Sequence, residues 1–129
     1  MQTNDLSTRT RRVSRRRGIA FAALIAIAAV VGVGALAVRA RLDPGEPVVG
    51  VHTIAVRDDE FAPAAIEVPA GTTVTWRWEG NAEHNVVGDG FDSPTQDDGT
   101  FVHTFSEPGR YSYRCTHHFF MRGEIVVTD

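Results

Sequence analysis

From residue 51 onward, apolar and polar side chains alternate in short runs, and residues that favour turns separate the runs. In one run Val74, Trp76 and Trp78 share a face, and the residues between them are polar. This period of two is typical of a half-buried β-strand, whereas the period of an amphipathic helix is weak along the whole segment. About 80 residues can enclose one small hydrophobic core. We therefore expect an all-β sandwich over residues 51–129.

Two stretches rich in turn residues divide the predicted strands. Residues 106–109 have the sequence Ser-Glu-Pro-Gly, and we expect them to join the runs 101–105 and 110–115 in a hairpin. Residues 88–99 are acidic and contain glycine and proline, so we expect a solvated loop there.

A different pattern fills the N-terminal part of the chain. Residues 18–38 are 21 positions without a charged side chain, and about 20 apolar residues are needed to cross a membrane as a helix. The run is longer than the roughly 7–15 apolar residues of a cleaved signal peptide, so we favour an uncleaved transmembrane anchor. A cleavable signal is the alternative, because residues 35–37 (Ala-Leu-Ala) resemble a processing site. An Arg-Arg pair ahead of the run also resembles a twin-arginine export signal.

Charge separates the same two parts of the chain. Residues 1–41 hold eight arginines and one acid, a balance of +7, whereas residues 42–129 hold five arginines and fifteen acids, a balance of −10. Six arginines precede the apolar run, so the positive-inside rule places the N-terminus in the cytoplasm and the acidic domain outside. We expect a single-pass cell-membrane protein, or a periplasmic or secreted one if the signal is cleaved. The predicted segments are a basic cytoplasmic tail at 1–17, an anchor or signal at 18–38, a linker at 39–50 and the β-domain at 51–129.

Four side chains of the β-domain form a candidate metal site. Cys115 is the only cysteine, and an exported domain with one cysteine cannot close an internal disulfide. His118 follows it by three positions and Met121 by six, while His84 lies 31 positions upstream. Two histidines, one cysteine and a weak methionine are the ligands of a blue-copper electron-transfer site. We therefore predict one copper ion per chain, held by His84, Cys115, His118 and Met121.

The ligand set favours an electron carrier over other metal chemistry. A trigonal plane of two histidines and a cysteine with a long methionine bond lies between the preferences of Cu(I) and Cu(II), so little moves when the electron does. Zinc is the alternative metal, but structural zinc sites favour Cys or His over Met as the fourth ligand. A copper enzyme needs a second copper, often connected through a His-Cys-His sequence, whereas Arg114 and Thr116 flank Cys115.

The motifs around these ligands resemble those of the cupredoxins, the blue type 1 copper proteins, and within them the amicyanin, halocyanin and plastocyanin groups. Residues 84–86 (His-Asn-Val) are similar to their first ligand motif, and residues 115–121 (Cys-x-x-His-x-x-Met) to their second. The resemblance covers roughly residues 50–129. It implies a Greek-key β-sandwich and one-electron transfer between a donor and an acceptor redox protein. It also implies that Asn85 ties the two ligand loops together.

Two residues depart from the pattern of that family. His117 stands where a proline usually precedes the second ligand histidine, and Glu83 stands where a proline often precedes the first. Because proline stiffens a loop, we expect its loss to loosen His118. We expect His117 to be an exposed loop residue, with metal binding as the alternative, and Glu83 to lower the reduction potential.

The sequence as a whole favours a membrane-tethered electron carrier that acts as a monomer between redox proteins and binds no nucleic acid. Copper delivery or storage without electron transfer is the alternative. Proteins with that role favour open sites rich in Met and Cys, whereas this chain has two methionines and one cysteine. We expect His52 and His103 to have structural roles, and Trp76 and Trp78 to pack in the core.

Overall fold

The computed structural model describes the backbone of residues 7–129 and the side chains of residues 24–40 and 42–129. The chain divides into two compact units, Met1–Ala40 and Arg41–Asp129. The described part of the first unit belongs to one helix, α1 (Ser7–Leu42).

Helix α1 contains the apolar run that the sequence places at residues 18–38. Its described apolar side chains are exposed, from Leu24, with 64 % of its surface exposed, to Val38, with 46 %. Among the described residues, no helix combines the length and the apolar character needed to cross a membrane. The basic tail at 1–17 and the first part of the apolar run lie outside the residues whose side chains are described. The anchor, the signal segment and the export of the domain therefore stay predictions.

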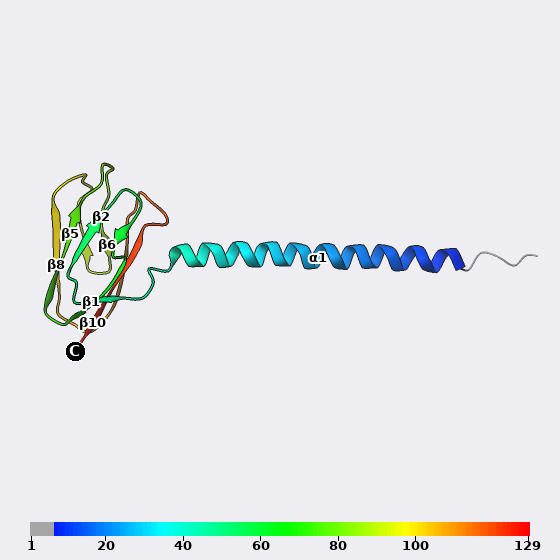
Figure 1. The fold of residues 1–129 in the computed structure, drawn as a ribbon, viewed down its shortest axis with the longest axis horizontal. Coiled ribbons are helices and arrows are strands. Elements are labelled where there is room, and N and C mark those ends of the chain that lie inside the picture. The colour runs from blue at the N-terminus through cyan, green and yellow to red at the C-terminus, as the bar shows by residue number, and fades with distance from the viewer. Residues whose placement is uncertain (1–6) are drawn as a thin grey trace, which may run out of the picture. The chain divides into compact units, whose positions relative to one another are not determined.

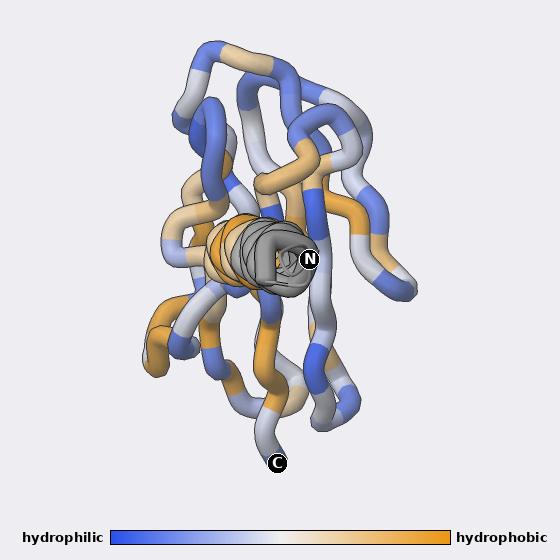
Figure 2. Tube along the Cα trace, turned by 90° about the vertical axis from the view of Figure 1, so that its right-hand side faces the viewer, coloured by the Kyte–Doolittle hydropathy of each residue, from blue (hydrophilic) through white to orange (hydrophobic). Residues whose placement is uncertain are grey.

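The second unit is a sandwich of two β-sheets (Figure 1). Its segments mix apolar and polar residues (Figure 2), and more buried and less buried positions alternate along its two longest strands, residues 72–78 and 122–128. The larger sheet has the strand order β1 (Val48–Val49), β4 (Ala65–Pro69), β10 (Arg122–Thr128), β9 (Gly109–Arg114), β6 (Val87–Gly88), β7 (Phe91–Asp92). The smaller sheet has the order β3 (Phe61–Ala62), β2 (Thr53–Val56), β5 (Thr72–Trp78), β8 (Thr100–Phe105). The β-sandwich predicted from the alternation is confirmed.

The chain passes repeatedly from one sheet to the other. Strand β4 lies in the larger sheet, β5 in the smaller, β6 and β7 in the larger, β8 in the smaller and β9 in the larger. As a result, strands that are not consecutive in the sequence lie side by side. Strand β4 pairs in parallel with β10, and β2 pairs in parallel with β5. The segments that follow β5 and β9 carry the candidate metal ligands, so the site depends on both sheets.

The predicted hairpin of residues 101–105 and 110–115 is wrong. Strand β8 pairs with β5, and β9 pairs with β10, so residues 106–109 cross from the smaller sheet to the larger. The Thr73 and Thr104 hydroxyls, 2.8 Å apart, add a side-chain hydrogen bond to the pairing of β5 with β8. A period of two identifies the buried face of a strand but not its neighbour, so the sequence pattern suits both arrangements.

Short strands also occupy segments that the sequence assigns to a loop and a linker. Strand β7 lies inside the predicted loop at 88–99 and forms a two-residue ladder with β6. The ring of Phe91 packs on Gly88 so closely that any Cβ there would overlap it. The loop prediction is therefore wrong at residues 88, 91 and 92. Glycine at position 88 suggested a turn, but its role is to leave room for the Phe91 ring. Strand β1 lies inside the predicted linker at 39–50 and pairs with β4.

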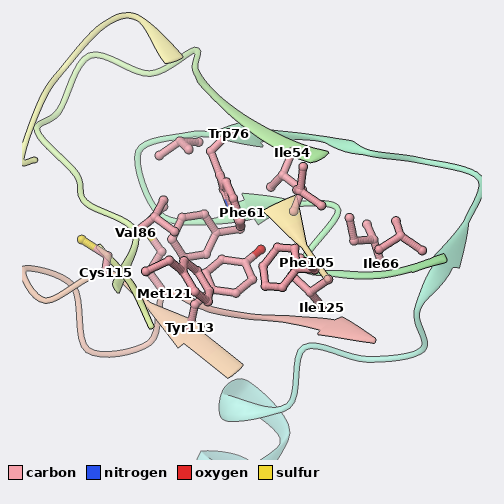
Figure 3. Close-up of a cluster of buried hydrophobic side chains, with 14 of the residues drawn as sticks. Ile54, Phe61, Ile66, Trp76, Val86, Phe105, Tyr113, Cys115, Met121 and Ile125 are labelled. Carbon is pink, nitrogen blue, oxygen red and sulfur yellow. The ribbon is translucent and has the colours of Figure 1, made fainter. Parts of the chain in front are cut away.

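A cluster of aromatic and aliphatic side chains fills the space between the sheets (Figure 3). Trp76 of β5 is fully buried, and its ring centroid lies 5.4 Å from that of Tyr113 on β9 and 5.7 Å from that of Phe91 on β7. Trp78 is also buried, with 7 % of its surface exposed. Both tryptophans are therefore core residues, as predicted.

His103 closes the edge of this cluster. Its imidazole stacks on the ring of Phe91 at a centroid distance of 5.0 Å and meets the ring of Phe105 edge-on at 4.8 Å. These contacts bridge the edge strands β7 and β8 and confirm the structural role predicted for His103. His52 lies just before β2 and is exposed.

Candidate metal centre

The turn between β9 and β10 carries three of the candidate ligands. Cys115 follows the last residue of β9, and Met121 immediately precedes β10. Within the turn the Cys115 N–H donates to the Met121 carbonyl at 3.0 Å, and the Met121 N–H donates to the His118 carbonyl at 3.0 Å. These two bonds close the turn, so all three side chains start from one compact loop between two paired strands.

The fourth candidate ligand, His84, comes from the segment between β5 and β6. Its backbone forms an isolated antiparallel bridge with Gln96, in which the His84 N–H donates at 2.9 Å and the Gln96 N–H donates in return at 3.0 Å. The side chain of His84 is fully buried. The bridge thus fixes the backbone that delivers this imidazole to the end of the core.

The geometry of three of these side chains fits one metal ion. Cys115 Sγ lies 3.8 Å from Nδ1 of His84 and 3.6 Å from Nδ1 of His118. All three ligand atoms lie within 4.8 Å of one another. An ion about 2.3 Å from a thiolate and about 2.0–2.1 Å from an imidazole nitrogen, as zinc is, holds these atoms about 3.5–3.8 Å apart at trigonal to tetrahedral angles. The spacing therefore suits a first-row transition metal.

The environment of His84 also suits a metal ligand. Burial lowers the pKa of its imidazole, and the neighbouring His118 lowers it further, which favours the neutral imidazole that a metal binds. Its Nε2 is buried without a hydrogen-bond partner among the described residues, and the contact recorded for its Nδ1 is with Cys115 Sγ, 3.8 Å away. A buried imidazole without a strong hydrogen bond is costly unless another bond compensates. A bond from Nδ1 to a metal would be such a compensation.

Met121 completes the predicted set at the edge of the core. It is 1 % exposed and Cys115 is 2 % exposed, and the two lie together at one end of the core cluster (Figure 3). His118 is half-buried, so it is the ligand candidate that reaches the surface. The four predicted residues are thus arranged as a copper site with one side open to other molecules.

Asn85 joins the two ligand segments directly. Its Oδ1 accepts the backbone N–H of Thr116 at 2.8 Å, and its Nδ2 donates to the Thr116 hydroxyl at 2.9 Å. Asn85 follows His84 in sequence, and Thr116 follows Cys115. The tie that the family resemblance implies for Asn85 is therefore present, and it links the residues next to two ligands.

The two positions that depart from the family pattern lie outside the cluster. His117 is exposed, and its Nε2 lies 3.1 Å from the Thr95 hydroxyl, pointing to a different neighbour from that of His118. Among the described residues, the only group of metal-binding side chains comprises His84, Cys115 and His118. His117 is thus the exposed loop residue that we expected. Glu83 is exposed as well.

Two further residues support the site without having been predicted from the sequence. Gln96 acts through its backbone bridge to His84, which a side-chain pattern cannot reveal. Ser93 is buried, and its hydroxyl accepts the N–H of Val86 at 2.8 Å and donates to the Pro94 carbonyl at 3.0 Å. A small polar residue inside the 88–99 segment was the only sequence signal for Ser93.

Comparisons with known proteins agree with this geometry. The profile for copper-binding proteins of the plastocyanin/azurin family matches residues 51–128. The chain is 33 % identical to amicyanin-alpha of Methylorubrum extorquens over 119 residues, which cover 86 % of this chain and 98 % of that protein. It is 46 % identical to the halocyanin of Natronomonas pharaonis over 77 residues, which cover 52 % of this chain and 47 % of that protein.

A solved structure gives the same result for the fold. The purple cupredoxin from Nitrosopumilus maritimus superimposes with a TM-score of 0.56 at 28 % identity, covering 60 % of this chain and 100 % of that one. The resemblance to the cupredoxins, stated from the two ligand motifs, is therefore confirmed.

The Asn85 tie leads to a test by metal removal. Asn85→Ala deprives the Thr116 N–H of its acceptor, and residues that orient metal ligands typically contribute about 10–100-fold to metal affinity. We therefore expect a chelator to extract bound copper at least about 10-fold faster from Asn85→Ala than from the parent protein. Thr116→Val is the matched control, because it removes the hydroxyl but keeps the N–H bond to Asn85, and its effect should be smaller. Equal extraction from Asn85→Ala and the parent would contradict a role for the tie in holding the metal.

Proposed function

Because the chain belongs to the plastocyanin/azurin family of copper-binding proteins, we propose that it is an extracytoplasmic blue-copper electron carrier working between redox proteins. The observation that carries this proposal is the cluster of Cys115 Sγ with Nδ1 of His84 and His118, at 3.8 and 3.6 Å. With Met121 beside it, this donor set suits copper, which supplies a one-electron Cu(I)/Cu(II) couple when bound.

The protein's own residues keep the site rigid. The Asn85–Thr116 bonds join the two ligand segments, and the Cys115–Met121 backbone bond closes the ligand turn. Rigid ligands lower the structural change that accompanies electron transfer. A rigid, buried site also favours a carrier over copper delivery, which needs an open site that exchanges its metal.

An exposed aromatic pair marks the surface where we expect partners to bind. Phe119 is 65 % exposed and Phe120 is 47 % exposed, and their rings meet edge-on at a centroid distance of 5.1 Å. Both follow the half-buried His118 in the ligand turn. Large exposed aromatic side chains are typical of interaction surfaces. We propose that electrons enter or leave through the edge of His118 beside this pair.

Two arginines lie at this surface. Arg114 and Arg122 are directly opposite each other in the β9–β10 pair, and the Arg122 guanidinium lies 5.5 Å from the Phe119 ring centroid. Within the described part of the chain the structure records no ion pair for either, whereas Arg57, Arg77 and Arg110 each pair with a glutamate. Like charges opposite each other in a sheet are destabilising. A partner with acidic groups would compensate this pair of charges.

The N-terminal segment supports a proposed membrane location. The 21 uncharged residues at 18–38 follow six arginines, and the described apolar side chains of α1 are exposed. An exposed apolar helix is stabilised by an apolar surrounding such as lipid. We propose that this segment anchors the domain outside the cytoplasm, with export of a cleaved, free domain as the alternative.

Loading the protein with Cu(II) tests the proposed function. We expect an intense blue thiolate-to-copper absorption band, because Cys115 supplies the one thiolate of the chain, and Cys115→Ser should abolish the band. His84→Ala and His118→Ala should change the spectrum strongly. His52→Ala and His103→Ala are the matched controls and should leave the band in place. A Cys115→Ser protein that stays blue would overturn the site.

The role of Met121 is tested by the reduction potential. A weak axial sulfur favours Cu(II) over Cu(I), so its removal favours the reduced state. We expect Met121→Leu to keep copper and colour and to raise the potential measured by voltammetry. An unchanged potential would show that Met121 serves only the core.

The charge of the proposed partner surface is tested with an anionic one-electron oxidant, hexacyanoferrate(III). Arg114→Glu should slow oxidation of the reduced protein about threefold or more at low salt, and the difference should shrink as salt screens it. Arg110→Glu changes the net charge equally on the same strand, but Arg110 is already paired with Glu124 at 2.6 Å. It should have the smaller effect. Equal slowing by both variants would point to net charge rather than to this surface.

A further inference from the structure

A carboxylate outside the cluster holds the segment that leads to His84. Asp58 lies in the turn between β2 and β3, and its Oδ1 accepts the backbone N–H of Asn81 at 2.6 Å and that of Ala82 at 3.0 Å. Hydrogen bonds to an ionised acceptor are about twice as strong as neutral ones. Consistent with these bonds, the N–H groups of Asn81 and Ala82 lower the pKa of the Asp58 carboxyl.

Gly80, which precedes Asn81 and Ala82, leaves the space that this contact with Asp58 needs. A Cβ at Gly80 would overlap the Asp58 carboxylate and lie 2.9 Å from its backbone nitrogen. Only glycine lets the two segments approach this closely. The Glu79 N–H also donates to the Val56 carbonyl at 2.9 Å, so the segment after β5 is joined to the end of β2.

His84 therefore sits at the end of a segment fixed on two sides. Asp58 holds residues 81 and 82 on one side, and the bridge to Gln96 holds His84 itself on the other. Between them stands Glu83, which lacks the fixed backbone angle of a proline. In place of a proline, the contacts with Asp58 and Gln96 restrain the backbone on either side of Glu83.

We infer that Asp58 is the positioning residue of His84: its carboxylate fixes residues 80–82 so that the imidazole is held in place for the metal before the metal binds. The inference rests on the proposed copper site, since it assigns His84 as a ligand. It adds a contact from the β2–β3 turn, a part of the sequence that carries none of the four ligands.

The metal-free protein provides the direct test, by amide hydrogen exchange of His84. The His84 N–H donates to the Gln96 carbonyl, so its exchange reports how firmly the segment is held. We expect Asp58→Ala to speed this exchange about 10-fold or more relative to a central amide of β10, such as that of Ile125. The ratio of the two rates separates local loosening from a general loss of stability.

Two variants serve as matched controls in that experiment. Asp59→Ala removes the neighbouring exposed acid and should leave the His84-to-Ile125 ratio unchanged. Asp58→Asn keeps an oxygen acceptor for the two N–H groups, so its ratio should lie closer to that of the parent than the ratio of Asp58→Ala does. A ratio in Asp58→Ala equal to that in Asp59→Ala would overturn the inference.

Copper extraction by a chelator links the same contact to the site. We expect about 10-fold faster extraction from Asp58→Ala than from Asp59→Ala. Gly80→Ala should act like Asp58→Ala, because its Cβ displaces the carboxylate. When Asp58→Ala and Gly80→Ala are combined, their effects on the extraction rate should be less than additive, because both changes disrupt the same contact. Fully additive effects would show that Gly80 and Asp58 act separately and would contradict the inference.

The outcomes also separate this inference from the proposed function. A parent protein that gives no blue band with Cu(II) refutes the copper site itself. A blue parent protein whose copper extraction is unaffected by Asp58→Ala refutes only the positioning role of Asp58.

Discussion

The contact between Trp76 of β5 and Tyr113 of β9 joins the two sheets, and the metal centre depends on it. The ring centroids lie 5.4 Å apart, and both side chains are buried. The chain reaches His84 six residues after β5 ends, and it reaches Cys115 directly after β9 ends. The imidazole of the first segment can therefore meet the thiol of the second only if the sheets keep a fixed separation. Interiors packed as densely as protein cores resist such shifts, which makes the core part of the site.

Polar contacts refine what the core sets. Core packing sets the position of one sheet relative to the other only approximately. A metal site needs more precision, because its ligand atoms must lie at defined distances from the ion. The bonds of Asn85 to Thr116, of His84 to Gln96 and of Asp58 to the segment before His84 supply that further precision. Each of them involves a backbone group, so each constrains the chain and not only a side chain.

The sequence predicted which side chains gather at the candidate metal centre better than it predicted which strands pair. Cys115, His118 and Met121 are of distinctive chemical types and lie on one turn, so their spacing alone indicated their chemistry. The β-sandwich followed from alternation at positions such as Val74 and Trp76. The hairpin was wrong, because alternation does not identify the partner of β8. Gln96 and Asp58 were missed for a related reason, since they act on backbone groups that any residue type provides.

The central position of β10 sets the order in which the centre can assemble. This strand begins directly after Met121. It lies between β4 and β9 in the larger sheet and pairs with both. A growing chain that has reached His118 already contains its thiol and both ligand imidazoles, yet the larger sheet still lacks its middle. Until β10 arrives, β9 has no partner on that side and the ligand turn has no closing bond at Met121. The turn that carries Cys115, His118 and Met121 is therefore complete only after β10 has paired with β9, and binding of one metal ion by all four residues would follow that pairing.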